Sequence, residues 1–148
     1  IVGLTTLLSD PEQELAEVIQ LVTGTELHVL TSGPIPPNPS ELLNSNRMTA
    51  LIGKLEQAFD IIIYDMPPIT SVTDAQIMST KTDGVIFVIR HGVSRKAAVH
   101  HAKELLEMVN ANILGVVFNG VDSNSYSPYD YYGYGYGYGY DGKSEGGA

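Results

Sequence analysis

The chain has 148 residues, which is enough for one compact domain, and 43% of them are hydrophobic against 17% charged. Only 8 lysines and arginines oppose 17 aspartates and glutamates, so the formal net charge of -9 repels the phosphate backbone and argues against a nucleic-acid partner. The sequence contains no cysteine, which excludes disulfides, zinc–thiolate sites and cysteine nucleophiles. Its apolar runs are only a few residues long, so we expect no direct membrane span in this chain.

The first thirty residues predict a helix followed by a strand. Ser9 and Glu12 fit a capping box, and we expect a helix that ends near Gly24. Its apolar face is formed by Leu15, Val18, Ile19 and Val22. Residues 27–31 are typical of a strand, and the prolines that follow in 32–39 exclude both a helix and an interior strand.

The next elements alternate between helix and strand. A helix is predicted from Ser40, with an apolar stripe made by Met48, Leu51, Ile52, Leu55 and Phe59. Residues 61–64 are apolar on both faces, as in a central strand of a parallel sheet that is covered on two sides. The remaining expected elements are a helix over 71–80, a strand over 85–89, a helix over 94–110 and a strand over 113–118.

This alternation predicts an α/β fold whose sheet is mainly parallel, with helices on both faces. The chain begins at Ile1, and its first residues are typical of the middle of a strand. We therefore expect an N-terminally incomplete piece of a longer protein. The composition changes sharply near Asp122. We therefore expect a folded unit over 1–122 and a flexible tyrosine-rich tail over 123–148.

Polar residues follow the predicted strands, where open α/β sheets bind their ligands. Asp65 comes directly after the most apolar strand and is a candidate Mg²⁺ ligand and catalytic residue; the alternative is an aspartate that caps the turn before two prolines. Asn119 could hydrogen-bond a purine edge, or could be a turn residue before Gly120. Arg90 could meet a phosphate or form a surface ion pair.

Two further observations complete the survey of candidate site residues. Thr73 and Asp74 read as polar groups near the start of a helix. A phosphate-binding loop of the form Gly-x-x-x-x-Gly-Lys-Ser/Thr occurs nowhere in the sequence, and the Gly-Lys-Ser at 142–144 follows no predicted strand. By itself, the chain is therefore expected to lack the part that would cradle ATP.

The tail contains eight of the nine tyrosines, largely alternating with glycine. They are Tyr126, Tyr129, Tyr131, Tyr132, Tyr134, Tyr136, Tyr138 and Tyr140. Alternating glycines forfeit cross-strand packing and raise the entropy cost of ordering, so disorder is predicted. Two functional hypotheses remain, a sticky aromatic segment or a set of phosphate acceptors; full phosphorylation would add roughly -12 to -16 charges.

Several segments together resemble a known family. They are residues 3–8, 30–43, 59–68, 72–75 and 115–119, with the terminal tyrosine cluster. In this order they are similar to the bacterial tyrosine kinases of capsule and exopolysaccharide synthesis, which are P-loop proteins related to partition-type ATPases. The resemblance implies a P-loop NTPase-like fold that uses ATP and Mg²⁺, in which Asp65 is the Walker B aspartate that positions Mg²⁺ and Asn119 lies near the adenine.

The same resemblance implies a function and partners. We expect a non-specific protein-tyrosine kinase that phosphorylates its own tail cluster and other proteins, and so regulates polysaccharide synthesis and export. It implies self-association as a ring, a membrane-embedded adaptor that activates the kinase, and a cytoplasmic location at the inner face of the membrane. This chain lacks the Walker A region and is expected to be inactive alone. The alternatives are a partition-type ATPase and a non-catalytic acceptor or regulatory module.

Overall fold

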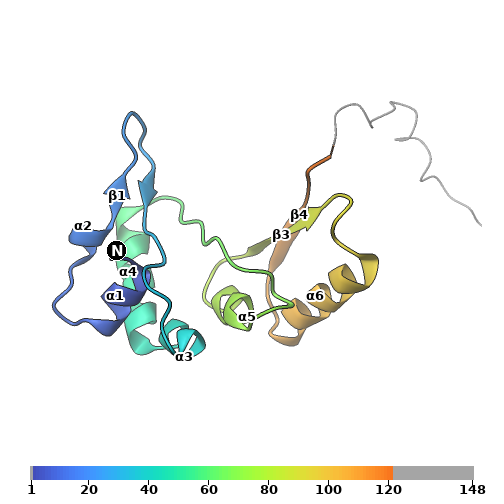
Figure 1. The fold of residues 1–148 in the computed structure, drawn as a ribbon, viewed down its shortest axis with the longest axis horizontal. Coiled ribbons are helices and arrows are strands. Elements are labelled where there is room, and N and C mark those ends of the chain that lie inside the picture. Colours follow the sequence, from blue (N-terminus) through green and yellow to red (C-terminus); the bar gives the residue numbers. More distant parts are fainter. Residues whose placement is uncertain (1, 122–148) are drawn as a thin grey trace, which may run out of the picture.

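A computed structural model describes residues 2–121 of the chain (Figure 1). The predicted tail and its eight tyrosines lie outside these residues. In chain order the elements are α1 (Leu4–Ser9), α2 (Leu15–Val18), β1 (Gln20–Leu21), β2 (His28–Val29), α3 (Pro39–Leu43), α4 (Asn46–Ala58), α5 (Asp74–Ser79), β3 (Val85–Arg90), α6 (Lys96–Met108) and β4 (Ile113–Asn119). The longest helices, α4 and α6, have 13 residues each, and none of the described helices has the length and apolar character needed to cross a membrane.

The beginning of the chain differs from the prediction of a strand and one long helix. Residues 2–3 form no strand, and α1 begins at Leu4. Ser9 is the last residue of α1, so it forms no capping box with Glu12; the Glu12 amide instead donates to the Asp10 carboxylate at 3.0 Å. Of the predicted helix, only the four residues of α2 are helical. A short helix is only marginally stable, and the residues that follow pair in a hairpin instead.

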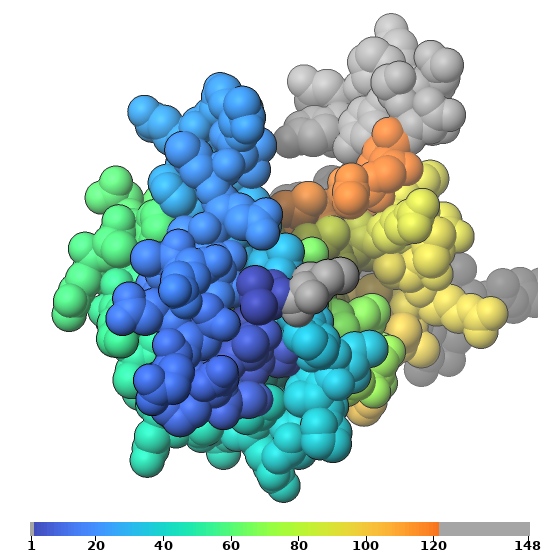
Figure 2. All heavy atoms as spheres, turned by 60° about the vertical axis from the view of Figure 1, so that its left-hand side comes forward, coloured from blue at the N-terminus to red at the C-terminus, as the bar shows by residue number. Residues whose placement is uncertain are grey.

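A β-hairpin takes the place of the second half of that helix. β1 and β2 pair antiparallel, with Gln20 opposite Val29. The Val22 amide donates to the Leu27 carbonyl at 2.8 Å, and Gly24 turns the chain with a φ of 80°. The hairpin projects from the rest of the surface (Figures 1 and 2). The prediction of a strand at 27–31 is confirmed only in part, since β2 has two residues.

Helix α4 carries the main core. Four of the five residues of its predicted stripe are buried, namely Met48, Leu51, Ile52 and Leu55. The fifth, Phe59, follows the helix as its C-cap and packs partly buried against the core cluster. The Ser45 hydroxyl accepts a hydrogen bond from the Met48 amide at 3.2 Å and caps the helix, so the predicted helix from Ser40 is split into α3 and α4. The core cluster is completed by Leu7, Leu8, Val18 and Met78.

Residues 61–64 do not form the predicted central strand. The segment has no ladder partner, since the described residues form only two separate pairs of strands, β1–β2 and β3–β4. Its predicted cover is also missing on one side, where Ile61 and Ile63 are 81% and 87% exposed. A strand is defined by its neighbour as well as by its own sequence, and in the described part of the chain no neighbour lies beside this segment.

The second half of the chain confirms the α/β class. β3 and β4 pair in parallel through the crossover helix α6, and the register places Arg90 beside Asn119. Figure 1 shows α5 and α6 on the same side of this pair. In the described residues the opposite face lacks the helical cover that the sequence predicts, and its apolar side chains are exposed, namely Ile86, Val88, Leu114 and Val116.

Candidate functional site

Asp65 lies in the extended segment that links the two groups of elements in Figure 1. Side chains along extended backbone point alternately to opposite sides. Asp65 lies on the exposed side with Ile61 and Ile63. The side chains that pack against the core cluster are Ile62, Tyr64 and Met66. The carboxylate is therefore presented to solvent by a backbone that its two neighbours anchor to the core.

This arrangement fits one protein ligand of a Mg²⁺ ion. In residues 2–121, no group of three or more His, Cys, Asp or Glu side chains is placed to hold a metal. Mg²⁺ does not need such a group, because it keeps several waters and binds one or two carboxylates together with phosphate oxygens. An exposed aspartate fits this requirement. The sequence contains no glycine-rich P-loop of the form Gly-x-x-x-x-Gly-Lys-Ser/Thr.

Tyr64, which directly precedes Asp65, packs against the core cluster but leaves its own hydroxyl without a hydrogen-bond partner. The side chain is half-buried and its Oη is buried without a hydrogen-bond partner in the described structure. Burial raises the pKa of Tyr64 above its ordinary value, and the negative charge of Glu56 raises it further. Both effects disfavour the phenolate, so Tyr64 stays neutral and acts as an apolar anchor.

Tyr64→Phe is expected to stabilise the fold by about 1 kcal/mol at neutral pH, because it removes a buried hydroxyl without a partner. The raised pKa also gives a pH dependence: the contribution of the neutral phenol is complete below a pH of about 10 and is lost as the pH rises through the folded-state pKa. Urea unfolding at pH 7 and above pH 10 measures both effects. A variant less stable than the wild type at pH 7 would contradict this role of the hydroxyl.

Asn119 and Arg90 meet at the carboxyl end of the parallel pair. They are register partners, and the His91 amide donates to the Asn119 carbonyl at 2.8 Å. The Asn119 side-chain oxygen accepts from the Gly120 amide at 2.8 Å, which is the turn contact of the alternative interpretation. Neither residue forms a described hydrogen bond or ion pair with Asp65, so the structure does not join these candidates in one cluster.

A polar network joins the two groups of elements. The Ser40 hydroxyl, at the start of α3, lies 3.0 Å from the Thr73 hydroxyl and donates to the Asp74 carboxylate at 3.1 Å. Thr73 and Asp74 are thus at a helix start, as predicted, but they also contact a residue more than 30 positions away. Sequence reasoning missed Ser40, because a lone serine after a proline carries no signal of so distant a contact.

The proline-rich loop, residues 31–39, is fixed at its first end by α1. The amides of Leu4 and Thr5 donate to the carbonyls of Thr31 and Ser32 at 2.8 and 3.0 Å. The Thr5 hydroxyl donates to the Pro34 carbonyl at 2.8 Å. At its second end the loop runs into α3 and the Ser40 network, so both ends of the loop are held by hydrogen bonds.

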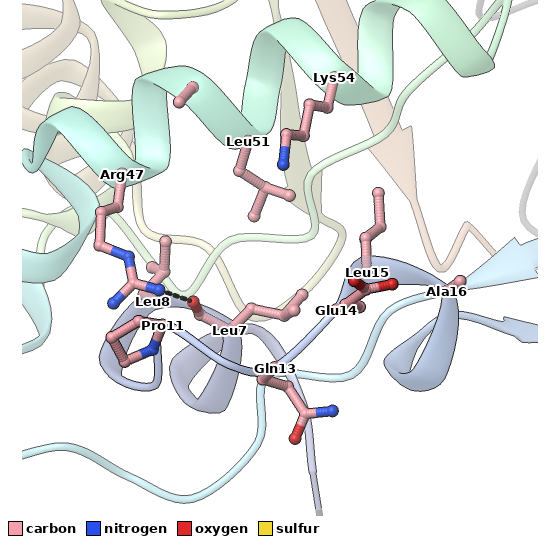
Figure 3. Close-up of a pocket in the computed structure, with 11 residues that line it drawn as sticks. Leu7, Leu8, Pro11, Gln13, Glu14, Leu15, Ala16, Arg47, Leu51 and Lys54 are labelled. Carbon is pink, nitrogen blue, oxygen red and sulfur yellow. Dashed lines mark hydrogen bonds between the residues drawn. The ribbon is translucent and has the colours of Figure 1, made fainter.

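A surface cavity of about 490 Å³ lies between α4 and the chain from α1 to α2 (Figure 3). Neither Asp65 nor Asn119 lines it. On its wall, the Arg47 guanidinium donates to the carbonyls of Leu7 and Asp10 at 3.0 and 2.8 Å. These carbonyls end α1, where a positive charge is favourable, so Arg47 has a structural role.

Arg47→Ala is expected to lower the free energy of unfolding by about 1–2 kcal/mol. The change removes two hydrogen bonds that the charged guanidinium donates to backbone carbonyls at a partly exposed site. Lys54→Ala is the matched control. Lys54 lines the same cavity from the same helix and forms no ion pair in the described residues, so we expect a change within about 0.5 kcal/mol. Equal urea midpoints for the two variants would rule out the capping role.

Comparison with known proteins shows which proteins the chain resembles in sequence and fold. No family model matches the chain. The chain is 42% identical over 132 residues to the tyrosine-protein kinase YwqD of Bacillus subtilis, covering 89% of the chain and 55% of the relative. It is 40% identical over 130 residues to the putative tyrosine-protein kinase CapB of Staphylococcus aureus, covering 88% and 57%. The chain thus spans a little over half the length of these relatives.

Solved structures agree with the sequence comparison. The kinase domain of the Escherichia coli tyrosine kinase ETK superimposes with a TM-score of 0.77 at 33% identity, over 93% of this chain and 51% of that one. The VpsO kinase domain gives 0.75 at 30% identity, over 81% and 59%. By sequence and by fold, the chain is a homologue of the bacterial tyrosine-protein kinases, and its P-loop NTPase-like class is that of their kinase domains.

Proposed function

We propose that the protein to which this chain belongs is a protein-tyrosine kinase that transfers phosphate from Mg-ATP to tyrosine hydroxyls. The observation that carries the proposal is Asp65, an exposed carboxylate on a backbone anchored to the core. The support for a kinase rather than another phosphate-using enzyme comes from relatives named tyrosine-protein kinases at 36–42% identity.

In this proposal each part of the chain has a separate task. Asp65 would hold Mg²⁺, and the bound ion would supply neutralisation of charge on the transferring phosphoryl group. Ile62, Tyr64 and Met66 keep the carboxylate fixed, because a ligand that must find its position again at each turnover is less effective. Asn119 would approach the adenine with its amide nitrogen, since its oxygen accepts from Gly120.

The acceptors would be the tail tyrosines and tyrosines of other proteins. The test is phosphotyrosine mass shifts on Tyr126–Tyr140 after Mg-ATP is added to the full-length polypeptide. Hydrolysis of ATP without such shifts would favour a partition-type ATPase. Shifts that appear only when a separate kinase is added would favour a non-catalytic acceptor module.

The chain of residues 1–148 is expected to be inactive on its own, because its sequence contains no loop to cradle the ATP phosphates. Titration calorimetry with Mg-ATP should give no heat of binding for this chain, whereas the full-length polypeptide should bind. Binding of ATP by the chain alone would show that phosphates are held by residues other than a P-loop, and would overturn the division of roles above.

We also propose the biological setting that the family resemblance implies. The kinase would regulate capsular or exopolysaccharide synthesis and export, assemble as a ring and respond to a membrane adaptor at the cytoplasmic face. Sedimentation of the full-length polypeptide with and without the adaptor's cytoplasmic segment tests the assembly. The support is the similarity to kinases such as CapB and CpsD.

A further inference from the structure

The two candidate nucleotide contacts lie in different groups of elements. We call α1 to α4 with the hairpin the first group, and α5 to β4 the second group (Figure 1). Asp65 follows Ile62 and Tyr64, which pack against the core of the first group, whereas Asn119 ends β4 in the second group. A nucleotide carries its phosphates and its base at opposite ends of one molecule. Both contacts are therefore made at once only when the two groups are held at one spacing.

Helix α5 bridges the two groups. Its Met78 side chain is 2% exposed and belongs to the core cluster, together with side chains of the first group. Its Gln76 side chain donates to the Leu105 carbonyl of α6 at 3.2 Å, within the second group. A helix of six residues is too short to be stable on its own, so the orientation of α5 depends on such contacts.

The start of α5 is bound to α3 by two hydrogen bonds. The Ser40 hydroxyl donates to the Asp74 carboxylate at 3.1 Å and lies 3.0 Å from the Thr73 hydroxyl. A hydroxyl has one hydrogen, so Thr73 is the donor of the second bond and Ser40 its acceptor. The bonds form a chain that ends on a carboxylate, and Ser40 and Asp74 are partly buried. Both features strengthen hydrogen bonds.

These bonds add a direction that apolar packing lacks. The burial of Met78 holds α5 against the core, but the hydrophobic effect is non-directional. Hydrogen bonds, in contrast, require a narrow range of distances and angles. Ser40 is itself fixed, because Leu42 and Leu43 of α3 pack against the core cluster. The contact between Ser40 and Asp74 therefore sets the angle at which the second group leaves the core.

We propose that Ser40 and Asp74 are positioning residues that hold Asp65 and Asn119 at the spacing that a nucleotide requires. The inference rests on the proposed function, for which it names the residues that align the two ends of the site. Loss of the contact leaves each end of the site intact but lowers the fraction of molecules in which the ends are aligned. The apparent dissociation constant rises by the inverse of that fraction.

The first test compares two ligands on the full-length polypeptide by titration calorimetry. Mg-ATP uses both ends of the site, whereas Mg-tripolyphosphate uses only the phosphate end. Ser40→Ala is expected to weaken Mg-ATP binding about five- to tenfold, as for the loss of one hydrogen bond to a carboxylate, and to change tripolyphosphate binding by less than about twofold. The KM for ATP should rise with the dissociation constant, while kcat stays within about twofold. Ser40→Thr keeps the hydroxyl and should bind both ligands as the wild type does.

Ser45→Ala is the matched control for a loss of stability. The Ser45 hydroxyl caps α4 by accepting from the Met48 amide at 3.2 Å, so its removal destabilises the first group while the bonds between α3 and α5 remain. Its affinity for Mg-ATP should equal that of the wild type. Equal weakening of Mg-ATP binding in Ser40→Ala and Ser45→Ala would overturn the proposal. Equal weakening of both ligands by Ser40→Ala would overturn it too.

The second test measures the spacing of the groups without nucleotide. One pair of spin labels is placed on the full-length polypeptide at the exposed positions of Lys54 in α4 and His100 in α6. We expect one narrow distribution of distances for the wild type and Ser40→Thr, and a broader one for Ser40→Ala; equal widths would overturn the proposal. A wild-type polypeptide that binds neither ligand would instead count against the kinase function, and the distances alone would then decide whether Ser40 sets the spacing.

Discussion

Asp65→Asn is expected to lower kcat of the full-length kinase by about 10²–10³-fold, because the amide keeps the shape of the side chain but removes the charged oxygen ligand of Mg²⁺. The Mg²⁺ concentration for half-maximal rate should rise in parallel. Initial rates of tail phosphorylation across a Mg²⁺ titration measure both quantities.

The structure supplies a matched control in Asp60→Asn. Asp60 is also exposed, precedes the same extended segment and undergoes the same change of charge. Its rate should stay within about twofold of the wild type, and neither substitution should change the free energy of unfolding by more than about 0.5 kcal/mol, since both are exposed surface changes. Equal losses of activity in the two variants would show that net charge rather than ligation matters.

The spacing of apolar residues in the sequence is sufficient to predict helix α4 and the unit formed by β3, α6 and β4. Four of the five residues in the predicted stripe lie within α4, and all four are buried. The βαβ unit of β3, α6 and β4 was predicted from the same kind of pattern, and its parallel pairing followed from the length of the crossover. In both cases the pattern lies within one element or in elements that follow one another along the chain.

The prediction of one long first helix is wrong because the same residues also form part of a β-hairpin. Leu15 and Val18 are helical, but the same run of apolar residues continues into a hairpin that Gly24 turns. The prediction of a strand at residues 61–64 is wrong for a different reason. A strand must pair with a second strand, and the described residues provide none beside this segment. Both errors concern contacts that an apolar pattern does not specify.

In the candidate site, too, positions within one segment were predictable, whereas contacts between distant segments were not. The position of Asp65 after an extended apolar segment was predictable from the sequence. The contact of Ser40 with Asp74 was not, because it spans 34 residues and depends on how α3 and α5 pack. The close approach of Gly3 to Gly33 was equally invisible, since nothing in the sequence marks two distant glycines as neighbours.

Gly3→Ala is expected to lower the free energy of unfolding by about 3 kcal/mol or more, which is among the larger effects of a single substitution. A Cβ at position 3 would lie 2.5 Å from the Thr31 carbonyl oxygen and closer still to the Gly33 amide nitrogen. Backbone atoms cannot rotate away as a side chain can. The first turn of α1 would have to separate from the proline-rich loop, with loss of the hydrogen bonds from Leu4 and Thr5.

Gly24→Ala separates this steric effect from backbone strain. Gly24 has a φ of +80°, which costs an alanine about 1–2 kcal/mol, but a Cβ there would meet nothing within 4 Å. Gly3 has the opposite character, since its φ of -173° suits any residue and only the contact is forbidden. Urea unfolding should therefore rank Gly3→Ala well below Gly24→Ala in stability. The reverse order would mean that the proline-rich loop moves freely away from α1 when a side chain is added at position 3.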